Sequence, residues 1–382
     1  MRIGVDIRPL IDPHPSGVGE YADQLISAML SRGREHEFVL YANAYHLTRE
    51  EITSRFRGAN VSYRLTRIPN KLLHASISAL RVPTLDAFTG PVDCFFLPNW
   101  NFAAFSKRTK RVVLTVHDVT YLRYPQYYST RRRLWHRVIR ARRLIRQADA
   151  VISVSAHTGE EIHELFGVPT SRIHTVRSGL ARSFLERPST DDQRRVRGRY
   201  ALPERYGLLL ATIEPRKNLE GALLAYDAYI RTTGDDIDLV VVGARGWSVK
   251  SLERLHERLA TRSRIHFIGY VPSADRAPIY VQSAFFLFPS FAEGFGFPPL
   301  EAASQGVPVI ASATSALPEI IGDIALLVDP HDVGQISEAI REVVRDEQLR
   351  EQLARAGQQH VRSFSWDRTA DETLAVLTGG RA

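Results

Sequence analysis

Cysteine is almost absent from this sequence, because Cys94 is the single cysteine among 382 residues. An internal disulfide is therefore excluded, and the class of small disulfide-bonded secreted domains is excluded with it. No apolar run approaches the roughly 18 residues of a membrane-spanning helix. The opening Met1-Arg-Ile-Gly-Val-Asp6 predicts a first strand rather than a signal peptide. We expect a protein of the reducing cytoplasm, with Cys94 as a small core residue.

Acidic residues are also fewer than basic residues in this sequence. The sequence holds 50 Lys and Arg against 42 Asp and Glu, which gives a formal net charge of +8 and a pI near 9.7. This charge favours an anionic ligand or surface. A nucleic acid, a sugar nucleotide and an acidic membrane all fit it, so the charge alone does not choose among them.

Strand-like and helical patterns alternate along the whole chain, which predicts βαβ units and parallel sheets. The polar stretch 187–199 is the expected boundary between two domains. We predict an α/β protein with two doubly wound, Rossmann-like domains, 1–190 and 200–365, that face each other across a cleft. The expected strands are 3–7, 38–41, 92–97, 112–116, 150–154, 206–211, 239–242, 265–268, 284–288, 307–310 and 325–328.

The most informative stretch runs from Pro289 to Glu301 and reads PSFAEGFGFPPLE. It follows an apolar run that predicts a buried strand, and Pro298 and Pro299 suit the first turn of a helix. Glycines in the turn let backbone N–H groups approach a ligand, so strand, turn and helix start together predict an anion-binding corner. Glu293 falls on the loop, where it can reach neutral hydroxyls, and Glu301 falls in the first turns of the helix. A tight strand-to-helix turn without a ligand is the alternative.

A second candidate site begins after the predicted strand 206–211. Arg216 and Lys217 are adjacent and immediately precede a predicted helix, 219–230. Both side chains and the helix N-terminus can therefore converge on one polyanion.

The first domain offers two further candidates at expected carboxyl ends of strands, where open α/β sheets bind ligands. His117 and Asp118 follow the strand 112–116. Gly17 and Gly19 open a helix after the first strand and can face an anion. They do not indicate a dinucleotide, because the turn is long and the second strand, ending near Tyr41, lacks an acidic residue for a ribose.

The most basic segment is 130–146, which carries eight arginines. Leu134, Val138, Ala141 and Ile145 recur at helical spacing, so we predict an amphipathic helix. Its arginines are either solvated or contact anionic lipid or a lipid-diphosphate acceptor. No nucleic-acid motif accompanies them, and we expect no nucleic-acid partner.

The two glutamates at E-x7-E spacing, with Pro215-Arg-Lys-Asn218, resemble the signature of retaining glycosyltransferases of family 4, which have the GT-B fold. The resemblance covers nearly the whole chain in order. It implies that the last helix, about 366–382, crosses back onto the first domain. It also implies a nucleotide-sugar donor, a saccharide or lipid-linked saccharide acceptor, and a place on or near the inner face of the cytoplasmic membrane.

The resemblance implies a role for each candidate residue. Arg216 and Lys217 hold the donor diphosphate beside the backbone of Gly294, Phe295, Gly296 and Phe297. Glu301 binds the ribose, and the catalytic pair Glu293 and His117 lies at the sugar. Asp118 orients His117 or caps the next turn. The remaining substrate-binding residues are Tyr270 and Val271, which either contact the base or only pack within the domain, and Gly17 and Gly19 over the phosphates and acceptor.

No metal and no cofactor are expected. Asp236-Ile-Asp238 spells D-x-D, the metal motif of the other large glycosyltransferase fold, but it precedes a predicted strand instead of following one. We interpret it as a solvated turn, and no other cluster has metal-ligand spacing.

The overall pattern looks most like bacterial mannosyl- or deoxyhexosyl-transferases of surface-polysaccharide assembly. GDP-mannose is therefore the expected donor, with GDP-rhamnose or a UDP-sugar as alternatives. Two rival functions stay open: a sugar-nucleotide epimerase or hydrolase on the same fold, and a non-catalytic scaffold. The first needs an added acid/base pair that the sequence does not reveal, and the second would be expected to have lost a site residue.

Overall fold

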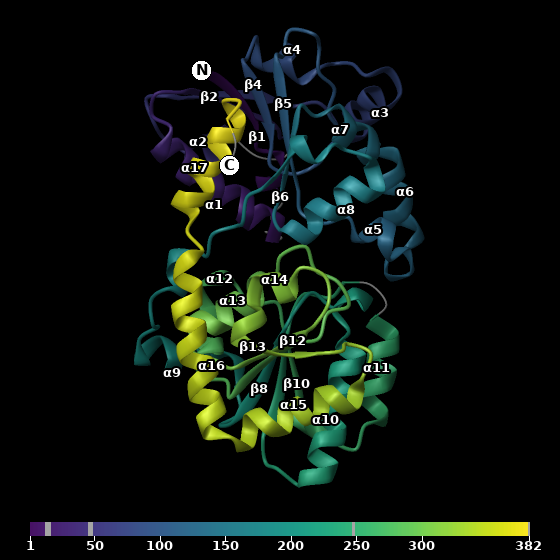
Figure 1. Cartoon of the computed structure of the whole chain (residues 1–382), viewed down its shortest axis with the longest axis vertical. Helices are drawn as coiled ribbons and strands as arrows, with labels where there is room; N and C mark the ends of the chain where they lie inside the picture. Colours follow the sequence, from purple (N-terminus) through teal and green to yellow (C-terminus); the bar gives the residue numbers. More distant parts are fainter. Residues whose placement is uncertain (12–16, 45–48, 247–248, 381–382) are drawn as a thin grey trace. The chain divides into compact units, whose positions relative to one another are not determined.

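The computed structural model describes residues 1–11, 17–44, 49–246 and 249–380, and the chain divides into two compact units (Figure 1). Unit 1 comprises Met1–Arg123, Thr130–Gly179 and Ser365–Ala382. Unit 2 comprises Tyr124–Ser129 and Leu180–Phe364. Each unit has its own parallel sheet and its own core.

Unit 1 is built on a parallel sheet, which has seven strands within the described ranges. Their order is β3-β2-β1-β4-β5-β6-β7. The central strands are buried along almost their whole length, as expected for a sheet covered on both faces. Cys94 lies fully buried in this core. The strands are β1 (Arg2–Asp6), β2 (Glu37–Asn43), β3 (Val61–Thr66), β4 (Cys94–Leu97), β5 (Arg111–Val116), β6 (Ala150–Ser153) and β7 (Ile173–Thr175).

The helices of unit 1 include the last helix of the chain, which packs on the first (Figure 1). Arg32 of α1 forms an ion pair with Asp371 of α17, with 2.6 Å between Nη2 and Oδ2. The C-terminal helix thus belongs to the domain formed by the first half of the chain. The helices are α1 (Gly17–Arg32), α2 (Arg49–Thr53), α3 (Asn70–Leu80), α4 (Leu85–Thr89), α5 (Thr120–Arg123), α6 (Thr130–Val138), α7 (Ala141–Gln147), α8 (Ala156–Phe166) and α17 (Trp366–Leu377).

Unit 2 repeats the same plan with strand order β10-β9-β8-β11-β12-β13. Its strands are β8 (Tyr206–Leu210), β9 (Asp238–Val242), β10 (Ile265–Gly269), β11 (Phe285–Phe288), β12 (Val309–Ser312) and β13 (Ala325–Val328). Its helices are α9 (Thr190–Tyr200), α10 (Leu219–Thr233), α11 (Val249–Arg258), α12 (Ser273–Tyr280), α13 (Phe297–Ser304), α14 (Leu317–Ile321), α15 (Val333–Arg345) and α16 (Glu347–His360).

Both sheets reverse their strand order at one place, between β1 and β4 in unit 1 and between β8 and β11 in unit 2. In open parallel sheets, ligands bind outside the carboxyl ends of the strands at such a switch point. The predicted α/β class with two Rossmann-like domains is confirmed by this topology. It also marks where each unit can hold a ligand.

Two strands were not predicted from the sequence, β3 and β7. Both lie at edges of the first sheet, and neither has a fully buried residue. Edge strands need fewer apolar residues, so their sequences lack the continuous hydrophobic run that marked the central strands.

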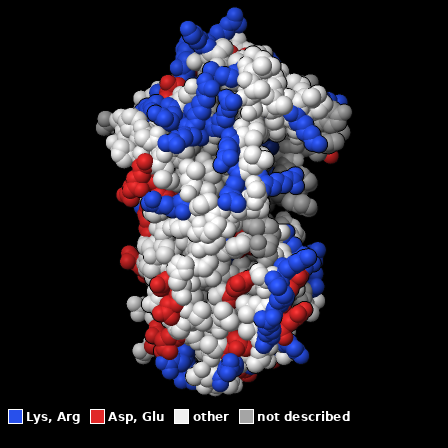
Figure 2. All heavy atoms as spheres, turned by 90° about the vertical axis from the view of Figure 1, so that its right-hand side faces the viewer, with Lys and Arg blue, Asp and Glu red and all other residues white. Residues whose placement is uncertain are grey.

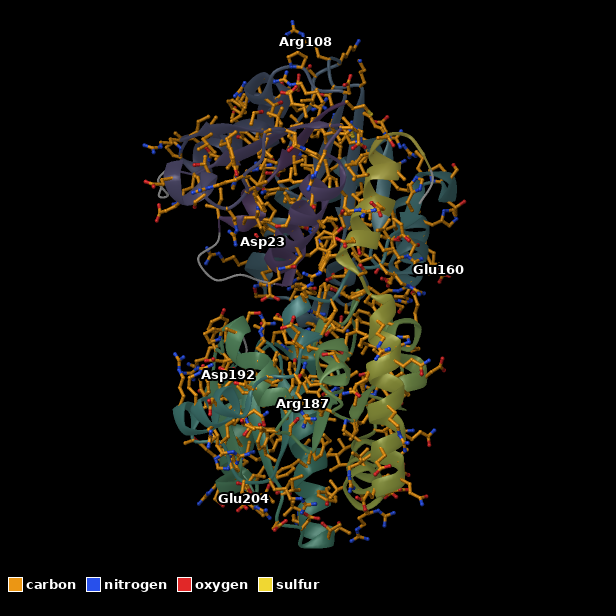
Figure 3. All side chains as sticks on the ribbon, turned by 90° about the vertical axis from the view of Figure 1, so that its left-hand side faces the viewer. Asp23, Arg108, Glu160, Arg187, Asp192 and Glu204 are labelled. Carbon is orange, nitrogen blue, oxygen red and sulfur yellow. The ribbon has the colours of Figure 1, made fainter. Side chains whose placement is uncertain are left out.

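The stretch 187–199, taken from its polarity as the boundary, lies inside unit 2, and unit 1 ends instead at Gly179. Most of the stretch forms α9, which packs on α12, and Arg195 pairs there with Asp275 at 2.9 Å. Ser189 caps α9 by accepting a hydrogen bond from the backbone N–H of Asp192, and Figure 3 shows Arg187 and Asp192 in this unit. The polar residues are thus an amphipathic helix with a capped start, not a linker.

Candidate functional site

Arg216 and Lys217 lie at the switch point of unit 2. They form a short turn after β8, and Asn218 ends that turn with φ of 53° in the left-handed region. The Asn218 side chain accepts from the backbone N–H of Gly221 and donates to the carbonyl of Pro330 at 2.7 Å. Asn218 therefore caps α10 and fixes the position of the two cations before it.

Glu293 is the group on which both cations converge. It lies on the loop after β11, the strand next to β8. Lys217 Nζ is 2.6 Å from Glu293 Oε1, and Arg216 Nη1 is 2.9 Å from Oε2. Arg216 also donates to the carbonyl of Ala292 and pairs with Glu214 at 2.9 Å. Four charged side chains thus form one cluster at the carboxyl edge of the sheet.

The cluster is largely removed from water. The side chains of Arg216 and Lys217 are 13% exposed, and that of Glu293 is 8% exposed. Burial opposes the ionised carboxylate, but the charges of Arg216 and Lys217 outweigh it and hold the pKa of Glu293 at about 2. Burial lowers the pKa of Lys217, with Arg216 acting in the same direction. Glu293 is therefore an anion at neutral pH, held between two cations.

The loop from Glu293 to the start of α13 has a fixed backbone. The N–H of Glu293 donates to Ser315 Oγ at 2.8 Å. Gly296 precedes α13 with φ of 103°, and a Cβ there would lie 2.7 Å from Leu317 Cδ2. Gly294, Phe295 and Gly296 are buried, and Phe297, at the helix start, is half-buried. Only glycine fits position 296, because it needs both the positive φ and the missing side chain.

Glu301 lies inside α13 and is 2% exposed. Its carboxylate accepts hydrogen bonds from the hydroxyl of Tyr280 at 2.9 Å and from Arg276 Nη1 at 3.3 Å. Both partners come from α12, so this carboxylate joins two helices. Its predicted role at a ribose stays a prediction, as do the roles of Tyr270, which is 48% exposed, and Val271, which is buried.

In unit 1, His117 follows β5 and has a defined protonation. A carbonyl only accepts, so the contact of 2.9 Å with Pro98 O requires the proton on Nε2. Burial lowers the pKa of His117, which keeps the ring neutral and leaves Nδ1 as an acceptor. The ring packs edge-on against Tyr21 of α1, with 4.6 Å between centroids. The helix that begins with Gly17 and Gly19 is thus a neighbour of His117, while residues 12–16 of the glycine loop lie outside the described residues.

The Asp118 carboxylate accepts from the backbone N–H of Thr120 at 3.0 Å, at the start of α5. Asp118 therefore caps the turn that follows it, which is one of the two roles predicted for this residue. The charge of Asp118 also acts on His117, where it opposes the lowering of the pKa by burial. Binding of substrate by Asp118 stays a prediction.

The sequence predicted one amphipathic helix over the segment 130–146. The structure has two helices there instead. α6 ends at Val138 and α7 begins at Ala141, with Arg140 between them at φ of 55°. Leu134 and Val138 on α6 are exposed by 57% and 43%, whereas Ala141 and Ile145 on α7 are buried. The apolar stripe seen in the sequence is therefore divided, because the left-handed residue turns the second helix into the core.

Metal and membrane features were searched over the described residues. No group of three or more His, Cys, Asp or Glu there could hold a metal ion. Asp238 of the D-x-D sequence begins β9 and pairs with Arg264 and His266, away from the carboxyl edge. Within the same residues, no helix is both long enough and apolar enough to cross a bilayer.

Several residues of the site were missed in the sequence. Glu214 neutralises Arg216, and Arg276 and Tyr280 hold Glu301. Glu214 had a signal, since it stands two residues before Arg216. The others come from distant elements, and only the folded chain places them beside the site.

The family models match both halves of the chain. Residues 15–183 match "Glycosyltransferase Family 4", and residues 192–360 match "Glycosyl transferases group 1". The chain is similar to an O-antigen chain mannosyltransferase B of Escherichia coli, with 34% identity over 73% of this chain and 71% of that protein. A serotype-specific mannosyltransferase WbdA of the same organism is 32% identical over 61% of this chain and 29% of that longer protein.

Solved structures agree on the fold. The sucrose-phosphate synthase of Thermosynechococcus elongatus superposes with a TM-score of 0.75 over 99% of this chain and 98% of that one, at 20% identity. Together with the two sheets, these matches confirm the resemblance inferred from the sequence motifs. The chain is a glycosyltransferase of family 4 with the GT-B fold.

Proposed function

We propose that this enzyme transfers mannose from GDP-mannose to a saccharide or lipid-linked saccharide acceptor in bacterial surface-polysaccharide assembly. The observation that carries the proposal is the convergence of Arg216 and Lys217 on Glu293 at the switch point of unit 2. The named mannosyltransferases among the relatives support the sugar. The choice of guanine as the base rests on the resemblance of the sequence motifs to bacterial mannosyltransferases.

Two adjacent cations suit a diphosphate. Each phosphate carries negative charge, and a guanidinium presents parallel N–H groups to its oxygens. When the anomeric C–O bond breaks, negative charge collects on the departing diphosphate. Arg216 and Lys217 stabilise that charge without a metal, in a site that is nearly dry.

The resemblance to retaining glycosyltransferases supplies the course of the reaction that we propose. The acceptor oxygen attacks the anomeric carbon on the face from which the diphosphate leaves, so the configuration is retained. The acceptor proton goes to an oxygen of the departing phosphate. Glu293 stabilises the oxocarbenium-like sugar as an anion and forms no covalent bond with it. The neutral His117 accepts a hydrogen bond from a sugar hydroxyl through Nδ1.

Peripheral contact with an anionic membrane belongs to the same proposal. α6 carries Arg131, Arg132, Arg133 and Arg137 together with exposed Leu134, and Figure 2 shows many Lys and Arg atoms on the face that it helps to form. Basic side chains near such a surface are attracted by about 1 kcal/mol each. A lipid-linked acceptor would be met at that surface.

The test is calorimetric titration of the metal-free protein with GDP and with UDP. We expect GDP to bind more tightly, and Arg216→Ala to weaken that binding by about 2 kcal/mol or more, the loss of a charge-assisted hydrogen bond pair. Arg205→Ala is the matched control. Arg205 lies just before β8, at the opposite end of the strand, and pairs with Asp235.

Each outcome of these experiments tests one part of the proposed function. Preference for UDP would overturn the donor and leave the site standing. Equal binding by wild type and Arg216→Ala would overturn the phosphate role. Binding of GDP without turnover of GDP-mannose in the presence of acceptor extracts would contradict the mannosyltransferase assignment.

A further inference from the structure

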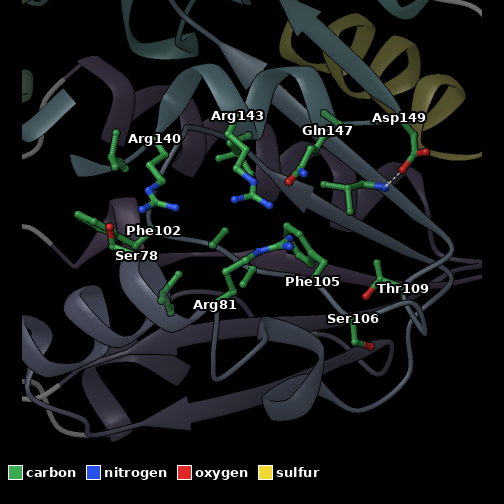
Figure 4. A pocket seen from close by; sticks show the side chains of 17 residues that line it. Ser78, Arg81, Phe102, Phe105, Ser106, Thr109, Arg140, Arg143, Gln147 and Asp149 are labelled. Carbon is green, nitrogen blue, oxygen red and sulfur yellow. Dashed lines mark hydrogen bonds between the residues drawn. The ribbon is translucent and has the colours of Figure 1, made fainter. Parts of the chain in front are cut away.

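A cavity of about 240 Å³ lies in unit 1 between α3, α7 and the segment 102–109 (Figure 4). Its volume is far above the roughly 15 Å³ that one water molecule needs. Apolar side chains form much of the wall, among them Ile77, Phe102, Phe105 and Leu144. Ser78, Ser106 and Thr109 add hydroxyl groups. The cavity can therefore hold a group that is partly polar and partly apolar.

Three arginines line this cavity. Figure 4 shows Arg140 and Arg143 extending into it from one wall and Arg81 from the opposite wall. The lining includes one acidic residue, Asp149, and its Oδ2 already accepts from the backbone N–H of Val112 at 2.8 Å. Over the described ranges, the side chains of these arginines have no ion pair or hydrogen bond. Like charges gathered without a counter-ion favour an anionic ligand.

The cavity is distinct from the transfer site. Its lining includes Thr109, Val112 and Asp149, which stand at the amino ends of β5 and β6. His117 stands at the carboxyl end of β5, five residues after Val112 along the strand Arg111–Val116. At about 3.3 Å per residue, Val112 lies roughly 16 Å from the edge of the sheet where His117 stands. An anion bound here is not the reacting diphosphate.

Exposed apolar residues lie next to residues that line the cavity. Leu80 and Val82 flank Arg81 and are exposed by 70% and 50%, and Trp135 and Val138 on α6 are each exposed by 43%. The Ser78 hydroxyl donates to the carbonyl of Val138 at 3.0 Å, which joins α3 to the end of α6. Exposed large apolar residues around a cationic hollow match an amphiphile with an anionic head and apolar tails.

We propose that this cavity binds the phosphate group of an anionic glycerophospholipid at the membrane surface. The three arginines hold the phosphate, the aromatic walls contact its glycerol, and Leu80, Val82, Trp135 and Val138 enter the acyl region. The inference deepens the membrane contact proposed above, since it replaces a diffuse attraction to α6 by one defined headgroup site. It does not depend on which sugar or base the enzyme uses.

Two of the arginines offer unusually clean variants. Arg81 and Arg140 both adopt left-handed backbone, with φ of 62° and 55°. Glycine accepts that conformation without strain, so Arg81→Gly and Arg140→Gly remove the guanidinium without demanding a new backbone. Arg64→Gln is the control for loss of one exposed positive charge elsewhere in unit 1, because Arg64 is exposed on β3, far along the sheet from β5.

The experiment measures flotation of the full-length protein with vesicles of phosphatidylcholine alone and of phosphatidylcholine with phosphatidylglycerol. We expect binding to the second only, weakened about tenfold or more in the double variant Arg81→Gly/Arg140→Gly and less than about twofold in Arg64→Gln. Soluble glycerol 3-phosphate should compete with the vesicles for the wild type. The same double variant should keep its affinity for GDP, which separates this site from the donor site.

Three results would overturn the proposal. If the double variant bound vesicles as tightly as Arg64→Gln does, a diffuse attraction through α6 would explain the membrane binding. Inorganic phosphate could bind with the same dependence on Arg81 and Arg140 while vesicle binding stays unchanged, which would indicate a free anion as the ligand. Equal binding to vesicles without phosphatidylglycerol would exclude recognition of an anionic headgroup. A thermal melt of each variant checks that it is folded.

Discussion

Two groups of cationic side chains in this molecule are built in opposite ways. In unit 2, Arg216 and Lys217 are nearly buried and paired with Glu293 and Glu214. In unit 1, Arg81, Arg140 and Arg143 are exposed residues that line a cavity with one carboxylate, Asp149, at its far end. Both groups suit an anion, but only the first is fixed before the anion arrives.

The difference follows from what each site has to do. A site that stabilises charge as a bond breaks must hold its cations in place, since reorganisation would cost part of the gain. The carboxylates of Glu214 and Glu293 compensate the burial of those cations, which would otherwise be unfavourable. A surface that meets a lipid headgroup needs no such fixed geometry. Exposed arginines can adjust, and water solvates them until the ligand arrives.

The largest effect is expected for Arg216→Ala. Removal of a preorganised donor at developing charge costs about 10²–10³-fold in rate, so sugar transfer should fall by at least that factor. Arg216→Lys should recover part of the rate, because it keeps the charge but loses the paired N–H groups. A radiolabelled transfer assay with saturating donor measures both. If Arg216→Ala left the turnover unchanged, the paired cations of unit 2 would not be a catalytic site that differs from the cavity of unit 1.

The next effect is on acid stability. The folded-state pKa of Glu293 is about 2, below its ordinary value of 4.5. A depressed pKa contributes stability that is present above the unfolded-state pKa and is lost as the pH falls through the folded-state pKa. The shift corresponds to about 3 kcal/mol, lost between pH 4.5 and 2. Denaturant titrations should show this loss for the wild type and a smaller one for Glu293→Gln, and identical slopes would contradict the ion-pair cluster.

The loop that carries Glu293 should be intolerant of a small change. Gly296→Ala places a methyl group against Leu317 at a residue with φ of 103°. We expect the free energy of unfolding to fall by about 2 kcal/mol, from strain and overpacking together. Gly198→Ala is the control, because a Cβ at Gly198 in α9 meets no atom within 4 Å and the helix gains from alanine. Equal stability of the two variants would contradict the close packing at α13.

The smallest effect is expected in unit 1. Arg140 has a left-handed backbone, which asparagine tolerates. Arg140→Asn therefore removes one exposed cation from a group of like charges without straining the backbone. Thermal unfolding should therefore show no loss, or a gain of about 0.5 kcal/mol. A loss like that of a buried ion pair would mean that the arginines of the cavity are structural, as those of unit 2 are.

Local pattern was enough to predict most of the architecture. Continuous apolar runs such as 285–288 marked the buried strands, and the positions of Arg216 and Glu293 after two of them followed from the chain order. What escaped prediction depends on contacts between distant residues. The edge strands β3 and β7 lack an apolar run, and the polar α9 belongs to unit 2 only because it packs on α12.

Two further features show the same limit. A single left-handed residue, Arg140, divides the basic segment into α6 and α7, and nothing in its spacing reveals that turn. Segment Tyr124–Ser129 belongs to unit 2, where Tyr127 stacks on Phe291 with 5.0 Å between ring centroids. The binding and catalytic roles assigned to His117, Glu301, Tyr270 and the glycines stay predictions.

The most direct test of the account is the affinity of metal-free Glu293→Gln for GDP, measured by calorimetry beside the wild type. If the diphosphate takes over the cations that Glu293 holds, loss of that carboxylate charge frees Arg216 and Lys217 for the ligand. We expect GDP to bind as tightly as to the wild type or more tightly, by up to about tenfold, while sugar transfer falls about 100-fold or more. Weaker GDP binding with unchanged transfer would contradict the account, because Glu293 would then support nucleotide binding and take no part at the sugar.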